Sequence, residues 1–176
     1  MIHATIDLKK EQQASLERPR YPYSAIARFF FAAMDVVTGS RTTLAKTKLI
    51  EMLASIPYRE WEFRQYIRMT RGYSCYDHVK LARSIMDWGR DAQDNEYWHL
   101  LVINQKMKED NLTNPWYLSF PVTFFMVLSY SLFARFLAWI NIRRAFLFNA
   151  EFEDHAEHVY ARFVEDHPEW ENQPVT

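Results

Sequence analysis

Glu96 and His99 are the residues of this sequence whose types and spacing most clearly suggest chemistry. They stand three positions apart in a strongly helical run, so both side chains would project from the same helix face. A carboxylate oxygen and an imidazole nitrogen placed in this way can bind one metal ion, and helical bundles use Glu-x-x-His pairs for that purpose. The same spacing also arises without metal, as a solvated glutamate beside a hydrogen-bonded histidine. The pair is therefore a candidate half of a metal site.

Carboxylates and histidines also gather in two other segments. Glu51 stands among apolar and small neighbours between Lys46 and Ile56, which is typical either of an inward-facing ligand or of a surface glutamate. Residues 149–164 are dense in side chains that can bind metal. The single cysteine, Cys75, excludes a disulfide within the chain and a cysteine-based metal site. Any metal would therefore be held by carboxylate oxygens and imidazole nitrogens.

The elements that position these residues are predicted to be helices. Three glycines in 176 residues, and apolar positions at helical spacing, indicate an all-α protein. The expected helices cover 25–37, 43–71 with a kink or break at Pro57, 78–109 and about 146–165. Around them we expect a polar N-terminal arm over 1–22, a single helical domain over 23–168 and a polar tail over 169–176. The first ten residues lack the apolar core of a signal peptide.

A long uncharged segment, residues 111–134, points to a membrane. It approaches the roughly 20 apolar residues of a spanning helix, but Trp116, Pro121 and several hydroxyl groups interrupt it and Arg135 follows it. A helix lying in one leaflet explains this mixture better than a span does, and both explain it better than a soluble helix. Aromatic residues make up 16% of the chain, which also favours a membrane. A net charge of -1 with dispersed basic residues argues against nucleic acid as a partner.

Three short motifs, taken in order, resemble those of one family. Leu49-Ile50-Glu51-Met52, leading to Pro57, is similar to a Leu-Glu-Thr motif that precedes an apolar run and a proline. Asn95-Glu96-Tyr97-Trp98-His99-Leu100 is similar to an Asn-Glu-Arg-Met-His-Leu motif, and Phe152-Glu153-Asp154-His155-Ala156 to a Leu-Glu-Glu-Glu-Ala motif followed by a tyrosine. On these motifs the chain, from about Tyr23 to Trp170, resembles the alternative oxidases, which include the plastid terminal oxidases and bacterial relatives.

The resemblance implies a ferritin-like di-iron helical bundle with membrane-interfacial helices. Members of this family are non-haem quinol oxidases, bound to one leaflet, that oxidise ubiquinol or plastoquinol and reduce O2 to water. It further implies two iron ions held by Glu51, Glu96, His99 and Glu153, with Tyr160 as the redox-active or quinol-proximal tyrosine and Lys46, Ile50 and Ala156 lining the quinol pocket. A homodimer or a larger membrane complex is expected, in a bacterial inner membrane, a mitochondrial inner membrane or a thylakoid.

The sequence also departs from the family pattern. The family closes its bundle with a further helix that carries a second Glu-x-x-His, whereas this sequence contains one such pair and ends at Thr176. The expected bundle is therefore incomplete at the C-terminus, unless a partner chain supplies the helix or neighbours of Glu153 act as ligands; those neighbours are Glu151, His155, Glu157 and His158. Three hypotheses remain open: a quinol oxidase, an oxidase-derived structural or assembly subunit without catalysis, and a helical membrane-interface protein without metal.

Overall fold

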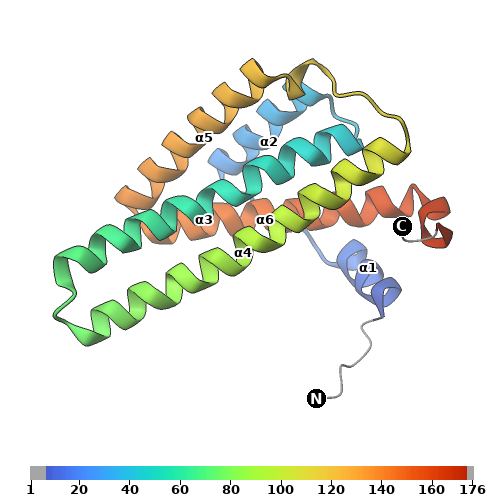
Figure 1. Ribbon diagram of the computed structural model, residues 1–176. Helices are drawn as coiled ribbons and strands as arrows, with labels where there is room; N and C mark the ends of the chain where they lie inside the picture. Colours follow the sequence, from blue (N-terminus) through green and yellow to red (C-terminus); the bar gives the residue numbers. More distant parts are fainter. Residues whose placement is uncertain (1–6, 174–176) are drawn as a thin grey trace. The chain divides into compact units, whose positions relative to one another are not determined.

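The computed structural model describes residues 7–173, and within this range the regular structure is entirely helical (Figure 1). The α-helices are α1 Leu8–Glu17, α2 Ala25–Thr38, α3 Leu44–Gly72, α4 Tyr76–Glu109, α5 Phe120–Ile140 and α6 Ile142–Glu165. Two short 3₁₀-helices, η1 Trp116–Leu118 and η2 Pro168–Asn172, precede α5 and follow α6. The all-α prediction is confirmed. The ferritin-like di-iron arrangement stays a prediction.

Helix ends follow local chemistry. Thr43 caps α3 by accepting a hydrogen bond from the Lys46 N–H at 3.1 Å, and Gly39 follows α2 with a φ of 85°, a conformation that glycine adopts at little cost. The segment expected as a polar arm contains α1, which Asp7 caps through its carboxylate. The signals at Gly39 and Thr43 explain why α2 ends and α3 begins within a few residues of the bounds expected from the sequence.

Of the kink or break expected at Pro57, the break does not occur, because α3 continues as one helix through it. A proline in a helix interior removes a backbone hydrogen bond and costs about 3 kcal/mol. Pro57 and its neighbours Ile56 and Tyr58 are all buried. Packing around the proline therefore compensates for the lost hydrogen bond.

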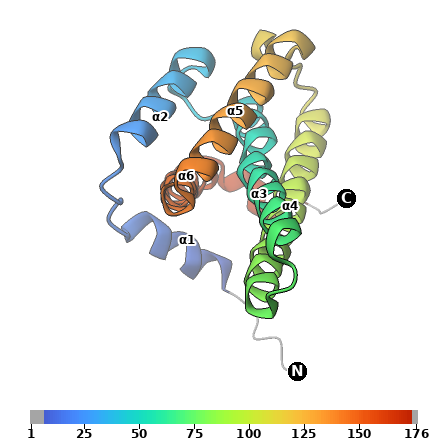
Figure 2. The same cartoon turned by 90° about the vertical axis from the view of Figure 1, so that its left-hand side faces the viewer.

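The chain divides into two compact units. One comprises residues up to Met34 together with those from Phe148 onward, and the other comprises Asp35–Leu147. The second unit contains the antiparallel pair α3 and α4, which lie side by side along most of their length (Figures 1 and 2). Gly89 of α4 lies against α3, since a Cβ added there would lie 3.4 Å from the Tyr58 carbonyl oxygen.

Helix α5 packs on α3 through one face and leaves the other exposed. At the packed face the buried carboxylate of Glu60 accepts hydrogen bonds from Ser131 Oγ and, at 2.6 Å, from Arg135 Nε. The exposed face carries large apolar side chains: Phe120, Phe124, Phe125, Leu128, Leu132, Phe136, Trp139 and Ile140. Among residues 7–173, α5 is the one helix long and apolar enough to cross a membrane by length and composition, and 17% of its most apolar window is buried.

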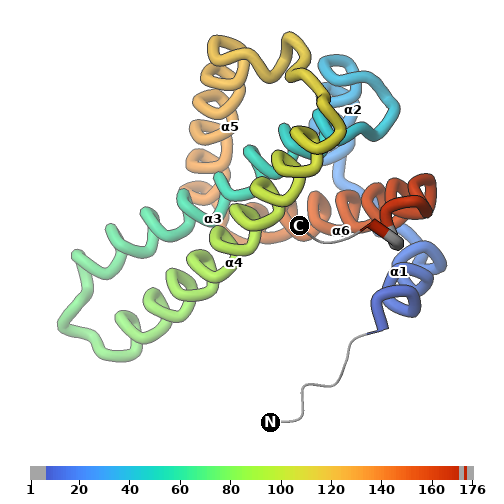
Figure 3. Tube along the Cα trace, turned by 45° about the vertical axis from the view of Figure 1, so that its right-hand side comes forward, coloured from blue at the N-terminus to red at the C-terminus, as the bar shows by residue number. Residues whose placement is uncertain are grey.

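In the first unit, α1 and the segment after it lie against α6 (Figure 3). The contacts are polar: Gln12 donates to the Ala161 carbonyl, Arg18 to Asp154 and Glu157, and the Ser24 N–H and hydroxyl to Glu151. Apolar packing in this unit comes from α2, where Phe30 and Phe31 contact the ring of Phe152 on α6.

Candidate metal site

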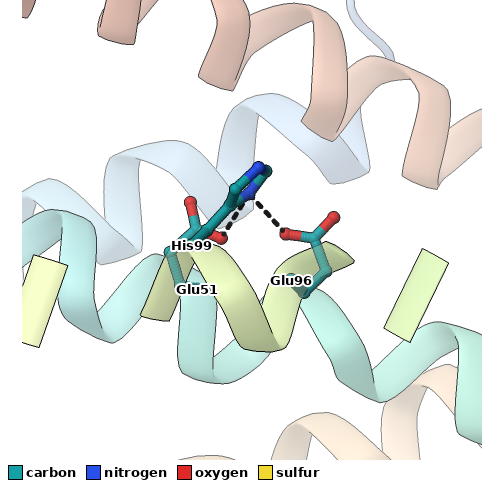
Figure 4. Close-up of side chains that lie close together, drawn as sticks. All are labelled: Glu51, Glu96 and His99. Carbon is teal, nitrogen blue, oxygen red and sulfur yellow. Dashed lines mark hydrogen bonds and ion pairs between the residues drawn. The ribbon is translucent and has the colours of Figure 1, made fainter. Parts of the chain in front are cut away.

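The structure brings Glu51, Glu96 and His99 together, with Glu51 on α3 and the other two on α4 (Figure 4). His99 Nδ1 lies 3.3 Å from Glu51 Oε2 and 3.5 Å from Glu96 Oε2. One potential ligand atom from each residue lies within 4.8 Å of the other two. Glu96 and His99, which belong to one motif, thus lie next to Glu51, which stands 45 positions before Glu96 in the sequence.

Helical geometry explains this meeting. Glu96 and His99 share a face of α4 because they are three residues apart, and α3 runs antiparallel to α4 with Glu51 on the facing side. The long side-by-side contact of the two helices fixes the register that places Glu51 opposite the pair.

The three side chains differ in their exposure. Glu51 is 3% exposed and Glu96 is 7% exposed, whereas 48% of the His99 side chain is exposed. Burying two carboxylates beside each other is costly unless a positive charge compensates them. The site therefore has a buried acidic interior and one open side, at His99.

The electrostatics of the cluster follow from this arrangement. The hydrogen bond to Glu51, followed by the one to Glu96, raises the pKa of His99 to about 10, against a smaller effect of burial in the opposite direction. The ring is then a cation that both carboxylates attract. A divalent metal ion supplies the same compensation and would bind to the neutral ring.

The donor set fits one metal ion. Carboxylate oxygen and imidazole nitrogen are suited to Fe²⁺, Mn²⁺ or Zn²⁺ and bind at about 2.0–2.2 Å. Two donors on one ion then lie at most about 4.4 Å apart, so a separation of up to 4.8 Å needs only a small adjustment. Three protein ligands leave further coordination positions for water, a substrate or other side chains.

The other predicted site residues on α6 belong to the first unit. Glu153, Ala156 and Tyr160 are all partly buried, and Glu153 Oε1 accepts a hydrogen bond from Asn149 Nδ2 at 3.4 Å. None of them is among the three residues of the cluster in the second unit. Their roles stay predictions: Glu153 as an iron ligand, Ala156 as a residue of the quinol pocket, and Tyr160 as the redox-active or quinol-proximal tyrosine.

The two other residues predicted to line a quinol pocket lie on α3. Ile50 is buried next to Glu51. Lys46 is also buried, and its Nζ donates to Asp35 Oδ1 and to the Gly39 carbonyl at the end of α2. In this structure the lysine therefore ties α3 to the end of α2, and its contact with a quinol stays a prediction.

The α6 residues considered as substitute ligands have other contacts. Glu151 accepts hydrogen bonds from Ser24, and Glu157 accepts them from Ser15 and Arg18. The ring nitrogens of His158 contact two backbone carbonyls, and the ring of His155 stacks on Phe31 at a centroid distance of 4.0 Å. These contacts attach the N-terminal segment to α6.

Sequence reasoning missed the buried charge at Glu60. Its partner Arg135 is the first charge after a long uncharged segment. An arginine that borders such a segment needs a counter-charge. The need for a carboxylate partner was therefore a signal in the sequence, but nothing in the sequence says which glutamate faces α5.

No model of a known protein family matches the chain, and no curated protein or solved structure matches it either. The likeness to the alternative oxidases therefore rests on the three motifs and on the cluster that two of them form.

Proposed function

We propose that this chain is a membrane-associated quinol oxidase that binds iron through carboxylates and histidine, oxidises ubiquinol or plastoquinol and reduces O2 to water. The observation that carries the proposal is the meeting of Glu51, Glu96 and His99, with one potential ligand atom from each lying within 4.8 Å of the others. Two separate motifs of the resemblance supply these three residues.

Iron bound by these residues would supply the one-electron steps that link quinol oxidation to O2 reduction. The chain's own part is to hold and shield it. Glu51 and Glu96 neutralise the charge of the ion, and their burial keeps water away from two of its ligands. The exposed ring of His99 marks the side from which a small molecule can approach. Tyr160, Lys46, Ile50 and Ala156 are the residues that the resemblance assigns to the quinol.

Helix α5 supports the membrane part of the proposal. Its exposed face is apolar over most of its length, while its packed face contacts the charged helix α3. Because α3 carries buried and exposed charges, a bilayer crossing by α5 would draw these charges into lipid. Lying in one leaflet, α5 buries its apolar face, and Arg143 and Arg144 after its end reach the headgroups.

A second candidate is an oxidase-derived structural or assembly subunit without catalysis. The observation in its favour is that the cluster has three protein ligands and an exposed histidine, whereas a di-iron centre needs more donors. In that case the chain would keep α5 as its membrane helix and would bind at most one metal ion.

Oxygen uptake decides between the two. The full chain is reconstituted into liposomes, loaded anaerobically with Fe²⁺ and supplied with a short-chain ubiquinol or plastoquinol. We expect quinol-dependent uptake that Glu96→Gln abolishes and that Asp94→Asn, an exposed carboxylate one half-turn away on α4, leaves unchanged. Iron binding without uptake would contradict the oxidase and support the non-catalytic subunit.

A further inference from the structure

Three buried hydrogen-bond donors in the second half of α3 have no acceptor. They are the indole Nε1 of Trp61, the guanidinium Nη1 of Arg64 and the amide Nε2 of Gln65, and none of these atoms has a hydrogen-bond partner among residues 7–173. Trp61 is 1% exposed and Gln65 is 0% exposed, so bulk water does not reach them. Buried donors in folded proteins are nearly always satisfied by protein, by water or by an ion. These three atoms therefore indicate a ligand that accepts hydrogen bonds.

The orientation of the Gln65 amide follows from its contact with Arg68. Arg68 Nη1 donates to Gln65 Oε1 at 2.8 Å, and a guanidinium group donates hydrogen bonds without accepting any. The amide oxygen must therefore face Arg68, because the opposite orientation would place two donors against each other. Nε2 is thus the unpaired atom of the amide, and all the unpaired atoms of this group are donors.

Helical spacing places these side chains on one face of α3. Trp61, Arg64, Gln65 and Arg68 occupy positions i, i+3, i+4 and i+7, which lie on the same side of a helix. We call this side the donor face. The ring of Trp61 contacts the ring of Phe146 on α6 at a centroid distance of 4.6 Å, and it lies in a buried cluster to which α5 also contributes. The donor face therefore begins beside the junction of α5 and α6, within one unit of the chain.

The positive charge of the donor face has no carboxylate to compensate it. In the part of the chain that the structure describes, neither Arg64 nor Arg68 forms an ion pair. The nearest carboxylates along α3 have other partners, since Glu60 binds an arginine of α5 at 2.6 Å and Glu62 binds an arginine of α4 at 2.7 Å. Burial, and then the charge of Arg68, lower the pKa of Arg64. A bound anion would compensate both guanidinium groups.

We propose that Trp61, Arg64, Gln65 and Arg68 form a binding site for a phosphate group. Ionised phosphate oxygens accept hydrogen bonds, as these donors require, and arginine binds phosphate through parallel N–H groups. Two positive charges suit a phosphate monoester better than a carboxylate, which has one charge and fewer oxygens. A metal cation is excluded by the charge of the site. A single water molecule does not satisfy the donors, because it brings hydrogens of its own that need acceptors.

The phosphate of a lipid headgroup is the source that the position of the site favours, and this assignment rests on the proposed membrane association of α5. With its apolar face in one leaflet, α5 ends at Ile140 near the headgroups, and the exposed Arg143 and Arg144 follow it. The donor face begins beside this junction, so a headgroup phosphate reaches it from the membrane surface. Free phosphate has the same chemistry, and the experiment separates the two sources.

Titration of the full chain in maltoside micelles, which contain no phosphate, tests the site. The probes are inorganic phosphate and a short-chain phosphatidic acid at constant ionic strength, and the readout is the NMR signal of the Trp61 indole N–H, assigned by its loss in Trp61→Phe. We expect a saturable shift of this signal, with an affinity at least about tenfold lower in Arg64→Gln. Arg59→Gln, which removes an exposed arginine from the opposite side of α3, should bind as wild type does. No saturable shift with either probe would overturn the proposal.

Gln65→Glu provides a second variant, because it keeps the size of the side chain and an acceptor for Arg68 but replaces the unpaired donor with a carboxylate. It should bind phosphate at least about tenfold more weakly and, in phosphate-free buffer, unfold at or above the wild-type temperature. Undiminished phosphate binding by this variant would contradict the site. An affinity gain for phosphatidic acid that Arg64→Gln removes identifies the lipid, whereas equal affinities for both probes would keep the site and overturn its assignment to lipid. Neither iron nor quinol is present, so failure here is distinct from failure of the oxidase proposal.

Discussion

His99 and the two buried carboxylates form a set in which a positive charge is required. In this structure the protonated ring provides it, with a pKa raised to about 10 by hydrogen bonds to Glu51 and Glu96. Bringing a metal ion to the same place removes the proton and keeps the charges balanced. The same three side chains would therefore be stable with either cation, which is why residue identity alone does not separate a metal site from a hydrogen-bonded cluster.

Tyr23 should make stability depend on alkaline pH. Burial, and then its hydrogen bond to Asp154, raise the pKa of this tyrosine to about 12. Its pKa in the unfolded chain is about 10, so its contribution is fully present below pH 10 and is lost as the pH rises towards 12. The difference in unfolding free energy between wild type and Tyr23→Phe should shrink over that range. A constant difference in urea titrations from pH 9 to 12 would contradict this.

Gly89 should tolerate a methyl group but nothing larger. A Cβ there would make ordinary van der Waals contact with the Tyr58 carbonyl at 3.4 Å. Gly89→Ala should therefore be neutral or stabilise by about 0.5–1 kcal/mol through helix propensity, whereas Gly89→Leu should destabilise by about 1–3 kcal/mol through overpacking. Thermal unfolding of the two variants provides the comparison. Equal midpoints for both would show that the helices are not in close contact there.

At the scale of the elements, the contacts of Glu60 on α3 with Ser131 and Arg135 on α5 stabilise the packing of these two helices. Removing Arg135 would leave a buried carboxylate with Ser131 as its remaining described partner. Leaving a buried acceptor without one of its partners costs about 1–3 kcal/mol, and the Arg135 side chain is 46% exposed and already interacts with water, so Arg135→Ala should lower the unfolding free energy by about 1–2 kcal/mol. Arg143→Ala, an exposed arginine close to the same end of α5, should change it by less than about 0.5 kcal/mol. Similar values for both variants in chemical denaturation would contradict the role of the pair.

The exposed face of α5 should decide membrane binding. Leu132 on this face is 58% exposed, and Leu81 on α4 is 55% exposed. Because the two leucines are exposed to a similar extent, the same Leu→Asp change at both positions separates the role of the α5 face from the general effect of adding a charge. Leu132→Asp should weaken binding to anionic liposomes by about tenfold or more, because in the proposed orientation a charge would replace a side chain buried in lipid. Leu81→Asp should bind as wild type does. Equal binding of both variants in flotation assays would contradict the assignment of α5 to the membrane.

The positions of α2, α3, α4 and α6 were predictable from the sequence, because apolar spacing and capping residues such as Thr43 and Gly39 are local signals. Helix α1 was not predicted, since its segment was expected to be a polar arm. The continuity of α3 through Pro57 was not predictable in the same way. It depends on burial of the proline between neighbouring helices, which is a property of packing and not of the local sequence.

At the scale of the whole molecule, the grouping of Glu96 with His99 could be predicted from the sequence because the two residues are neighbours on one helix face. The motif order pointed to Glu51 as their partner across the helix pair. The contacts of Glu60 with α5, and of His158 with Arg18, join residues that are 75 and 140 positions apart. No spacing rule within one helix reveals such pairs, because they depend on how separate helices pack.

The cluster and the site residues predicted on α6 lie in different units of the chain. The cluster lies within Asp35–Leu147, whereas Glu153 and Tyr160 lie in the unit that contains α1 and most of α6. Metal binding by Glu51, Glu96 and His99 therefore requires no residue of the other unit. The resemblance to a di-iron oxidase requires more, and the two claims can be tested separately.

The central claim is that Glu51, Glu96 and His99 bind a metal ion, and equilibrium dialysis of the full chain against Fe²⁺ without oxygen tests it most directly. We predict at least one iron per chain in wild type and in the control Asp94→Asn, and an affinity at least about tenfold lower in Glu96→Gln and in His99→Ala. A wild-type chain that retains no iron, or a Glu96→Gln chain that retains as much as wild type, would contradict the account.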